Sequence, residues 1–255
     1  MGFRRGPSIV RDGLVLALDA GSLRSYPGTG TTWSDLSTSN NNGTLVNGVA
    51  YSTANGGILT FDGTDDYVSL STGFDSTASS LFADAGRSWS VSCVFKFPTS
   101  PTTTRSTGNT AWVMLGRSGG IGGAETFSLF VGGNGNTTYG DFSYKLAIGI
   151  RGGKTQISPS AVNTNTWNHV VVTWNGTTGY SYFNGTLIGT LTIGTAALQT
   201  GYLLTVGSTG NTGAGASSLF MYEGNIAVAQ VYNKALTSNE ITQNYNNYKK
   251  RFNLS

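Results

Sequence analysis

Short runs of β-branched and aromatic residues, separated by tight-turn pairs, recur along most of this sequence. The runs Thr44–Val49 and Tyr67–Leu70 are two examples, and such enrichment with alternation favours strands. Asn-Gly pairs, as at Asn184-Gly185, accept the positive φ that two-residue hairpin turns require. The pattern therefore predicts an all-β chain built from many short strands.

Length and composition agree with one large β domain. The 255 residues include 37 Gly and only 5 Pro, and the 38% of hydrophobic residues can fill one sizeable core. Because β-sandwiches of this length fold as single units, we expect one domain of two packed sheets. The expected strands are Gly13–Ala20, Thr44–Val49, Gly57–Phe61, Tyr67–Leu70, Ser88–Phe97, Ala111–Leu115, Thr126–Val131, Tyr144–Ile150, Trp167–Trp174, Tyr180–Phe183, Thr186–Leu191, Tyr202–Val206 and Ile226–Tyr232.

Two of these strands carry more specific expectations. Gly13–Ala20 is almost continuously apolar, which predicts a central strand covered on both faces. In Trp167–Trp174, the alternate residues Val170, Val172 and Trp174 fall on one face. Trp167, His169, Val171 and Thr173 fall on the opposite face.

One helix is predicted close to the C-terminus. Thr237 and Glu240 have the spacing of a capping box, in which a hydroxyl and a carboxylate satisfy free amides at a helix start. Ile241, Tyr245 and Tyr248 then recur at helical spacing. This pattern predicts one short helix that packs an apolar stripe on the sandwich.

Charge is sparse and gathers at the two ends. Only 11% of residues are charged, the net charge is +3, and the body between the basic ends is slightly acidic. Nucleic-acid binding needs Lys and Arg along a groove, so this distribution excludes nucleic acid as a partner. We divide the chain into a basic arm (1–12), a domain (13–248) and a basic tail (249–255), the ends being either docking arms or solvated termini. The basic residues at the ends are Arg4, Arg5, Arg11, Lys249, Lys250 and Arg251.

The single cysteine, Cys93, lies in a strand-like run and has no partner for an intramolecular disulfide. We expect it to be a small buried or half-buried thiol. The sequence has no apolar run of the length that a signal peptide or a membrane-spanning helix needs, so we expect neither a leader nor membrane insertion.

An ordered set of motifs covers nearly the whole chain. The motifs are Gly13–Asp19, Trp33–Leu36, Asn42–Leu45, Phe61–Val68, Trp167–Gly176, Tyr182–Gly185 and Val231–Thr237 with Glu240. Together they resemble the concanavalin A-like lectin/glucanase superfamily, in particular the laminin-G-like (LamG) domains of bacterial surface proteins and phage virion proteins. The resemblance implies a jelly-roll sandwich of two antiparallel sheets and a role in recognising glycans or proteins.

The opening residues Arg4–Val15 are similar to the start of stand-alone phage versions of this domain. The resemblance implies a non-catalytic structural protein on the exterior surface of a phage virion, as a capsid decoration or fibre-associated protein. Its partners would be phage capsid or fibre proteins and cell-surface glycans, and its copies would form a homo-oligomer on the virion. A free carbohydrate-binding lectin or adhesin is the first alternative, and a glycoside hydrolase is the second.

Residues suited to catalysis are few. Retaining glycosidases need two carboxylates about 5 Å apart, and in the glucanase relatives a Glu-x-Asp-x-x-Glu strand supplies them. None of Glu125, Glu223 and Glu240 begins such a motif. The only histidine, His169, lies in mid-strand, where a structural role is favoured over that of a hydrolase base. We therefore expect no enzymatic activity and no required cofactor.

The acidic turn that contains Asp62, Asp65 and Asp66 is the candidate metal site. Calcium prefers several carboxylate and carbonyl oxygens from a turn, and laminin-G-like relatives often bind it. The spacing lacks an Asp-x-Asp-x-Asp-Gly loop, however, and such side chains also cap backbone amides in turns. Calcium binding and turn capping are therefore both open interpretations.

Three aromatic residues in or beside expected loops, Trp33, Trp112 and Tyr139, are candidates for stacking on sugar rings. The alternative for each is packing under its own loop. The tryptophans assigned to the core are Trp89, Trp167 and Trp174.

Overall fold

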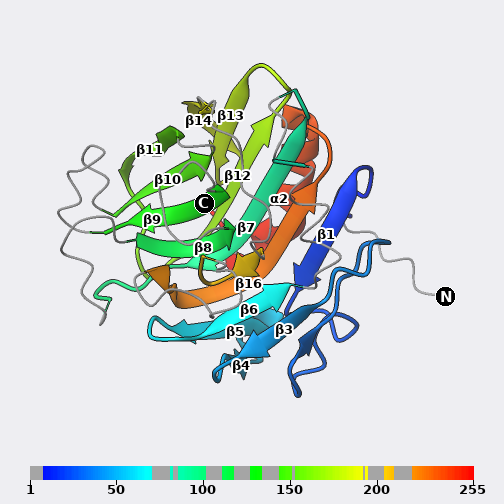
Figure 1. The fold of residues 1–255 in the computed structure, drawn as a ribbon. Helices are drawn as coiled ribbons and strands as arrows, with labels where there is room; N and C mark the ends of the chain where they lie inside the picture. The colour runs from blue at the N-terminus through cyan, green and yellow to red at the C-terminus, as the bar shows by residue number, and fades with distance from the viewer. Residues whose placement is uncertain are drawn as a thin grey trace.

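Alternating side chains fold the sequence into two antiparallel sheets with one α-helix against the outer face of the first, as the computed structural model shows (Figure 1). This confirms the predicted all-β jelly-roll sandwich with a C-terminal helix. The structure describes residues 8–70, 81–82, 86–101, 111–117, 127–133, 144–150, 153–191, 193–194, 204–209 and 220–255.

The first sheet, sheet A, is built around β7 and β16, and β1 pairs with the C-terminal half of β16. In the described part of the chain, all of its strand pairings are antiparallel. Its strands, in spatial order, are β14 (Thr186–Leu191), β13 (Gly179–Phe183), β12 (Trp167–Trp174), β7 (Trp89–Lys96), β16 (Glu223–Tyr232), β5 (Ile58–Asp62) and β4 (Ala50–Ser52), with β1 (Leu14–Asp19) beside β16. A short 3-10 turn, η1 (Ala54–Gly56), connects β4 to β5 in sheet A.

The second sheet, sheet B, lies across the core from sheet A and is also antiparallel. The strands of sheet B, in spatial order, are β11 (Gly153–Ala161), β10 (Lys145–Ile150), β9 (Phe127–Gly132), β8 (Ala111–Arg117), β15 (Thr205–Val206), β6 (Tyr67–Leu70), β3 (Gly43–Val46) and β2 (Thr32–Trp33).

The main core lies between the inner faces of the two sheets. Val91, Cys93 and Phe95 of β7 enter it from sheet A, and Leu129 and Val131 of β9 enter it from sheet B. Cys93 is fully buried there, as predicted, and burial raises the pKa of its thiol far above the ordinary value. Because the thiolate is the reactive form of cysteine, Cys93 is chemically inert in the folded protein.

The alternation predicted for β12 is confirmed. Val170, Val172 and Trp174 point into the main core, whereas Val171 belongs to a separate cluster on the outer face of sheet A. His169 also points outward, towards helix α2 (Ser238–Phe252). The strand is therefore covered on both faces, by sheet B on one side and by the helix on the other.

The capping box predicts the start of α2 correctly. The Thr237 hydroxyl accepts a hydrogen bond from the Glu240 amide at 3.3 Å, and the Glu240 carboxylate accepts one from the Thr237 amide at 2.9 Å. Ile241, Tyr245 and Tyr248 are buried against the outer face of sheet A, as the helical spacing predicts. In the described part of the chain, no helix combines the length and apolar character that crossing a membrane requires.

Strand β1 is covered on both faces, but the prediction that it is central is wrong. It pairs with β16 on one edge only. On the other edge, Ala17 donates its amide to the Asp35 carboxylate at 2.8 Å, and Asn41 donates its side-chain amide to the Val15 carbonyl at 2.8 Å. A polar loop thus provides hydrogen-bond partners to this edge of β1. The apolar sequence had predicted a second strand there.

Both predicted terminal boundaries need correction, because the ends belong to the folded domain. Val10 is buried and donates its amide to the Asn244 side chain of α2 at 2.8 Å. The Ser8 carbonyl accepts a hydrogen bond from Gln243 at 2.6 Å, so the arm packs on the helix from residue 8 onward. At the other end, Phe252 and Leu254 are buried, so 249–255 is the last turn and anchor of α2 rather than a tail.

Candidate functional site

The structure overturns the prediction that Trp33 and Trp112 stack on sugars. Trp33 is 0% exposed and Trp112 is 1% exposed, so neither ring offers a face to a ligand. The Trp112 ring lies 5.0 Å from the Phe97 ring and 5.8 Å from the Tyr144 ring, measured between centroids. Both tryptophans therefore belong to the core, and Tyr139 lies outside the described residues.

The docking role predicted for Arg251 is also wrong, because this side chain makes its contacts inside the domain. Its guanidinium binds the Asp19 carboxylate at 2.6 Å and donates to the carbonyls of Asn55 and Gly57 at 2.7 Å each. These contacts fix the end of α2 to β1 and to the turn before β5.

Three of the remaining basic candidates are exposed, and two lie outside the described residues. Arg11, Lys249 and Lys250 are exposed, and the Lys249 ammonium lies 5.4 Å from the centre of the Tyr245 ring. Their role as docking residues stays a prediction. Arg4 and Arg5 lie outside the described residues.

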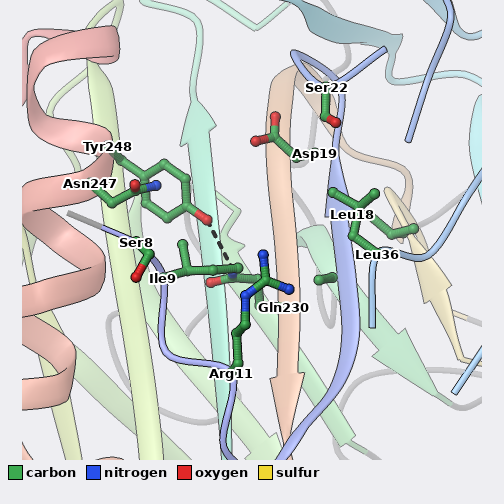
Figure 2. A pocket seen from close by; sticks show the side chains of 11 residues that line it. Ser8, Ile9, Arg11, Leu18, Asp19, Ser22, Leu36, Gln230, Asn247 and Tyr248 are labelled. Carbon is green, nitrogen blue, oxygen red and sulfur yellow. Dashed lines mark hydrogen bonds between the residues drawn. The ribbon is translucent and has the colours of Figure 1, made fainter. Parts of the chain in front are cut away.

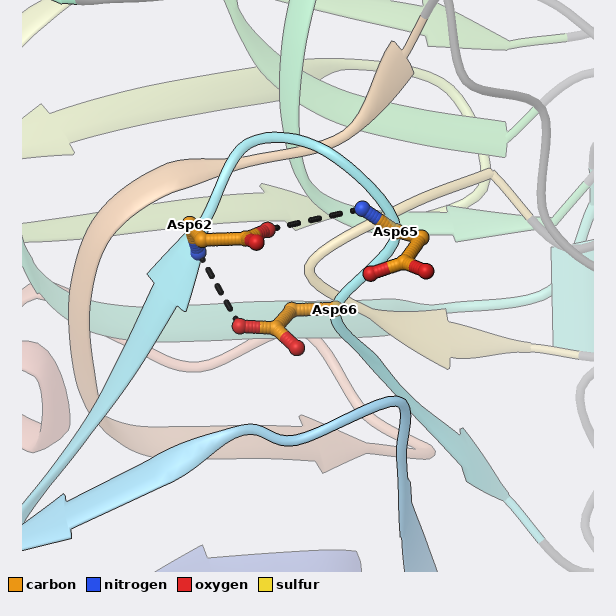
Figure 3. A group of neighbouring side chains, drawn as sticks. All are labelled: Asp62, Asp65 and Asp66. Atoms are coloured by element: carbon orange, nitrogen blue, oxygen red, sulfur yellow. Dashed lines mark hydrogen bonds between the residues drawn. The ribbon is translucent and has the colours of Figure 1, made fainter.

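The acidic turn between β5 and β6 brings its three carboxylates together (Figure 3). Asp62 and Asp65 are exposed, Asp66 is buried, and one oxygen of each lies within 4.8 Å of the others. The Asp62 carboxylate accepts the Thr64 amide at 2.7 Å, and the Asp66 carboxylate accepts the Asp62 amide at 3.1 Å. Turn capping is thus present, and one oxygen of each carboxylate also belongs to a cluster suited to a hard cation.

Burial, reinforced by the charges of Asp62 and Asp65, raises the pKa of Asp66 to about 6. A bound divalent cation would lower it again, because the positive charge favours the carboxylate. Sequence reasoning missed Glu223, whose position in β16 faces Asp62 in β5 and places a fourth carboxylate on the adjacent strand. Only the strand register reveals this neighbour, since more than 150 residues separate the two positions along the chain.

His169 has the surroundings of a packing residue. It is fully buried, its Nε2 lies 2.9 Å from the Ser92 hydroxyl, and its ring stacks near Tyr245 of α2. Burial lowers its pKa to about 4, so the imidazole is neutral at physiological pH. No solvent-exposed substrate can reach it without movement of the helix.

A pocket of about 320 Å³ opens on the outer face of sheet A, between the N-terminal segment, β1, β16 and α2 (Figure 2). At its floor, the Gln230 side-chain amide donates a hydrogen bond to the Tyr248 hydroxyl at 2.9 Å. The Gln230 carbonyl oxygen is buried and has no hydrogen-bond partner among the described residues. The lining residues are Ser8, Ile9, Arg11, Ala17, Leu18, Asp19, Ser22, Leu36, Gln230, Asn247 and Tyr248.

A second pocket, of about 230 Å³, lies beside the start of α2. Tyr180, 36% exposed, and the half-buried Tyr182 line it from β13, and Thr237 and Ser238 line it from the helix start. These tyrosines offer the accessible aromatic surface that Trp33 and Trp112 do not.

A family model described as the concanavalin A-like lectin/glucanases superfamily, of the laminin G type, matches residues 61–242. The chain belongs to the concanavalin A-like lectin/glucanase superfamily. This agrees with the two antiparallel sheets and confirms the resemblance drawn from the motifs. A search of curated proteins found no match to this superfamily member.

Solved structures share the fold at low sequence identity. Trypanosoma rangeli sialidase has 14% identity and a TM-score of 0.58, with 94% of this chain and 33% of the sialidase covered. The binding domain of Paraclostridial Mosquitocidal Protein 1 has 12% identity and a TM-score of 0.59, with 93% and 53% covered. The chain thus spans about a third to a half of these proteins.

Domain 4 of AbnA, an extracellular GH43 arabinanase from Geobacillus stearothermophilus solved with arabinotriose, is similar over its whole length. It has 17% identity and a TM-score of 0.58, with 92% of this chain and 100% of that domain covered. Likeness at this identity concerns the fold alone.

Proposed function

We propose that this superfamily member is a non-catalytic carbohydrate-recognition domain. The observation that carries the proposal is the full-length match to a sandwich solved with a bound arabinan oligosaccharide. The polar pockets on the outer face of sheet A supply surfaces of the kind that sugar ligands use.

The placement of the ionisable groups supports recognition rather than hydrolysis. A glycosidase places its two carboxylates on either side of the scissile bond, about 5 Å or more apart. Asp62, Asp65 and Asp66 all come from one short turn, and Glu223 is the cross-strand partner of Asp62, so these carboxylates approach a ligand from a single side. His169, neutral and covered by α2, is not placed to move a proton.

Glycan-array binding followed by product analysis tests both halves of the proposal. The wild-type domain should bind at least one glycan and release no reducing ends from it. Absence of binding to every glycan on an array of bacterial envelope, plant and animal glycans would reject the carbohydrate-recognition function. Release of reducing ends that disappears in Asp66→Asn would reject the non-catalytic assignment and restore the glycosidase alternative.

The same domain, we propose, is displayed on the exterior of a phage particle in several copies, bound to capsid or fibre proteins. Support comes from the similarity of Arg4–Val15 to the opening of stand-alone phage domains. Mass spectrometry of intact, purified particles should detect the protein at a copy number set by particle symmetry. Its absence from particles, with the free protein in the lysate, would favour the free lectin.

Calcium is the ion that we propose for the acidic turn, and its binding should stabilise the fold. A ligand at about 100 times its Kd adds about 2.7 kcal/mol to the free energy of unfolding. Millimolar calcium should therefore raise the melting temperature, and less at pH 5 than at pH 7, because protons compete for Asp66.

The exposed Asp65 allows a clean test of calcium binding. Asp65→Asn should abolish the calcium-dependent gain in melting temperature, whereas Asp12→Asn, at an exposed acid outside the turn, should retain it. A melting temperature that calcium leaves unchanged in the wild type would reduce the turn to backbone capping.

A further inference from the structure

The pocket described at the outer face of sheet A is built from several separate parts of the chain. Arg11 comes from the N-terminal segment, Asp19 from β1, Gln230 from β16, and Tyr248 from α2 (Figure 2). The segment is held in place by the hydrogen bonds of Ser8 and Val10 to the helix. The pocket is therefore a fixed feature of the folded domain.

Gln230 carries an unsatisfied hydrogen-bonding group at the floor of this pocket. The residue is 1% exposed, its side-chain nitrogen is bonded to Tyr248, and its side-chain oxygen has no partner among the described residues. A buried carbonyl without a donor costs about 1 to 3 kcal/mol, and native proteins rarely leave one unpaired. None of the described residues supplies a donor to this oxygen.

The rim offers both donors and acceptors over a partly apolar wall. Arg11 supplies donors, Asp19 supplies acceptors, and Asn247 supplies both, while Leu36 provides apolar surface. The Arg11 guanidinium is exposed and has no ion-pair partner among the described residues, and the Asp19 carboxylate is already neutralised by Arg251. A sugar ring that carries several hydroxyl groups matches this mixture, because each hydroxyl both donates and accepts.

We propose that this pocket binds one sugar residue of a glycan, with a ligand hydroxyl donating to the Gln230 oxygen and Arg11 and Asp19 holding hydroxyls at the rim. The inference rests on the proposed recognition function and assigns it to a place. The volume of about 320 Å³ suits a single ring, at the small end of the range of ligand sites. Longer glycans would extend past Arg11 into solvent.

Two variants test the pocket without removing the fold. Gln230→Met keeps the side-chain length but removes the acceptor, together with the amide that donates to Tyr248. It should weaken glycan binding about tenfold, the effect of one buried hydrogen bond left unmade. Arg11→Gln, at an exposed side chain, should weaken binding about threefold to tenfold. Arg24→Gln is the matched control, because Arg24 is exposed and does not line the pocket.

Binding is measured by calorimetry with the strongest glycan from the array. Saturation-transfer NMR with glucose, galactose, N-acetylglucosamine and glucuronic acid provides a second measurement, and melting curves confirm that each variant is folded. Weakened binding in Gln230→Met and Arg11→Gln, with unchanged binding in Arg24→Gln, supports the assignment.

Four results would overturn the assignment, and they are distinguishable. Unchanged binding in both pocket variants rejects the pocket while the recognition function stands, and loss in Tyr180→Ala alone would move the site to the second pocket. A crystal soaked with the array glycan that shows only ordered water against Gln230 also rejects the pocket. Absence of any sugar binding by the wild type rejects the recognition function itself.

Discussion

Replacing Trp112 by alanine is expected to lower the free energy of unfolding by about 3 to 5 kcal/mol, the usual effect of removing a buried tryptophan. The side chain is 1% exposed and lies between Phe97 and Tyr144. Its removal leaves a cavity that the surrounding strands of sheet B can fill only in part. Urea unfolding followed by circular dichroism measures the change.

The control variants separate core packing from ligand contact. Trp112→Phe should lose much less stability, since an aromatic ring still contacts Phe97 and Tyr144. Tyr180→Ala, at a partly exposed position, should leave the unfolding curve close to that of the wild type. A Trp112→Ala protein with wild-type stability but no glycan binding would contradict the burial and restore the residue as a ligand contact.

Lowering the pH from 7 to 4 is expected to reduce the free energy of unfolding by about 3 kcal/mol through His169 alone. The folded protein holds this imidazole at a pKa of about 4, because burial disfavours its charged form. The unfolded chain binds a proton below an ordinary pKa of 6.5. Between these two values the unfolded state holds more protons, so stability falls as the pH falls.

The single histidine makes this effect measurable at one site. Urea unfolding curves are measured at several pH values from 4 to 7. The free energy of unfolding should change more with pH in the wild type than in His169→Gln. That difference isolates His169 from the carboxylates, including Asp66, whose raised pKa acts in the opposite direction. An imidazole NMR resonance that titrates near pH 6.5 in the folded protein would contradict the burial and reopen a role in proton transfer.

Local patterns predicted the elements whose side chains have one clear periodicity. The faces of β12 and the start and buried stripe of α2 follow from spacing alone. Strands β2 and β4 were missed because two or three residues carry no periodicity. Strand β11 was missed because it is mostly polar and pairs only with β10, at the edge of sheet B.

The candidate site depended on packing between distant segments, which the sequence pattern does not contain. Trp112 was assigned to a ligand because it lies beside a loop, yet Phe97 and Tyr144 enclose it. Gln230 is one polar residue in an apolar strand, and only the approach of α2 buries it. The acidic turn was found from its composition, but its neighbour Glu223 required the register of β5 and β16.

Burial of Cys93 leaves the folded chain with no native thiol that a maleimide reagent can modify, since this is the only cysteine. A cysteine introduced at Ser22, on the rim of the pocket, would then be the single labelling position. A fluorophore attached there would change its emission when a ligand displaces water from the pocket. The inert core thiol thus makes the domain suitable for a one-site optical sensor without prior removal of native cysteines.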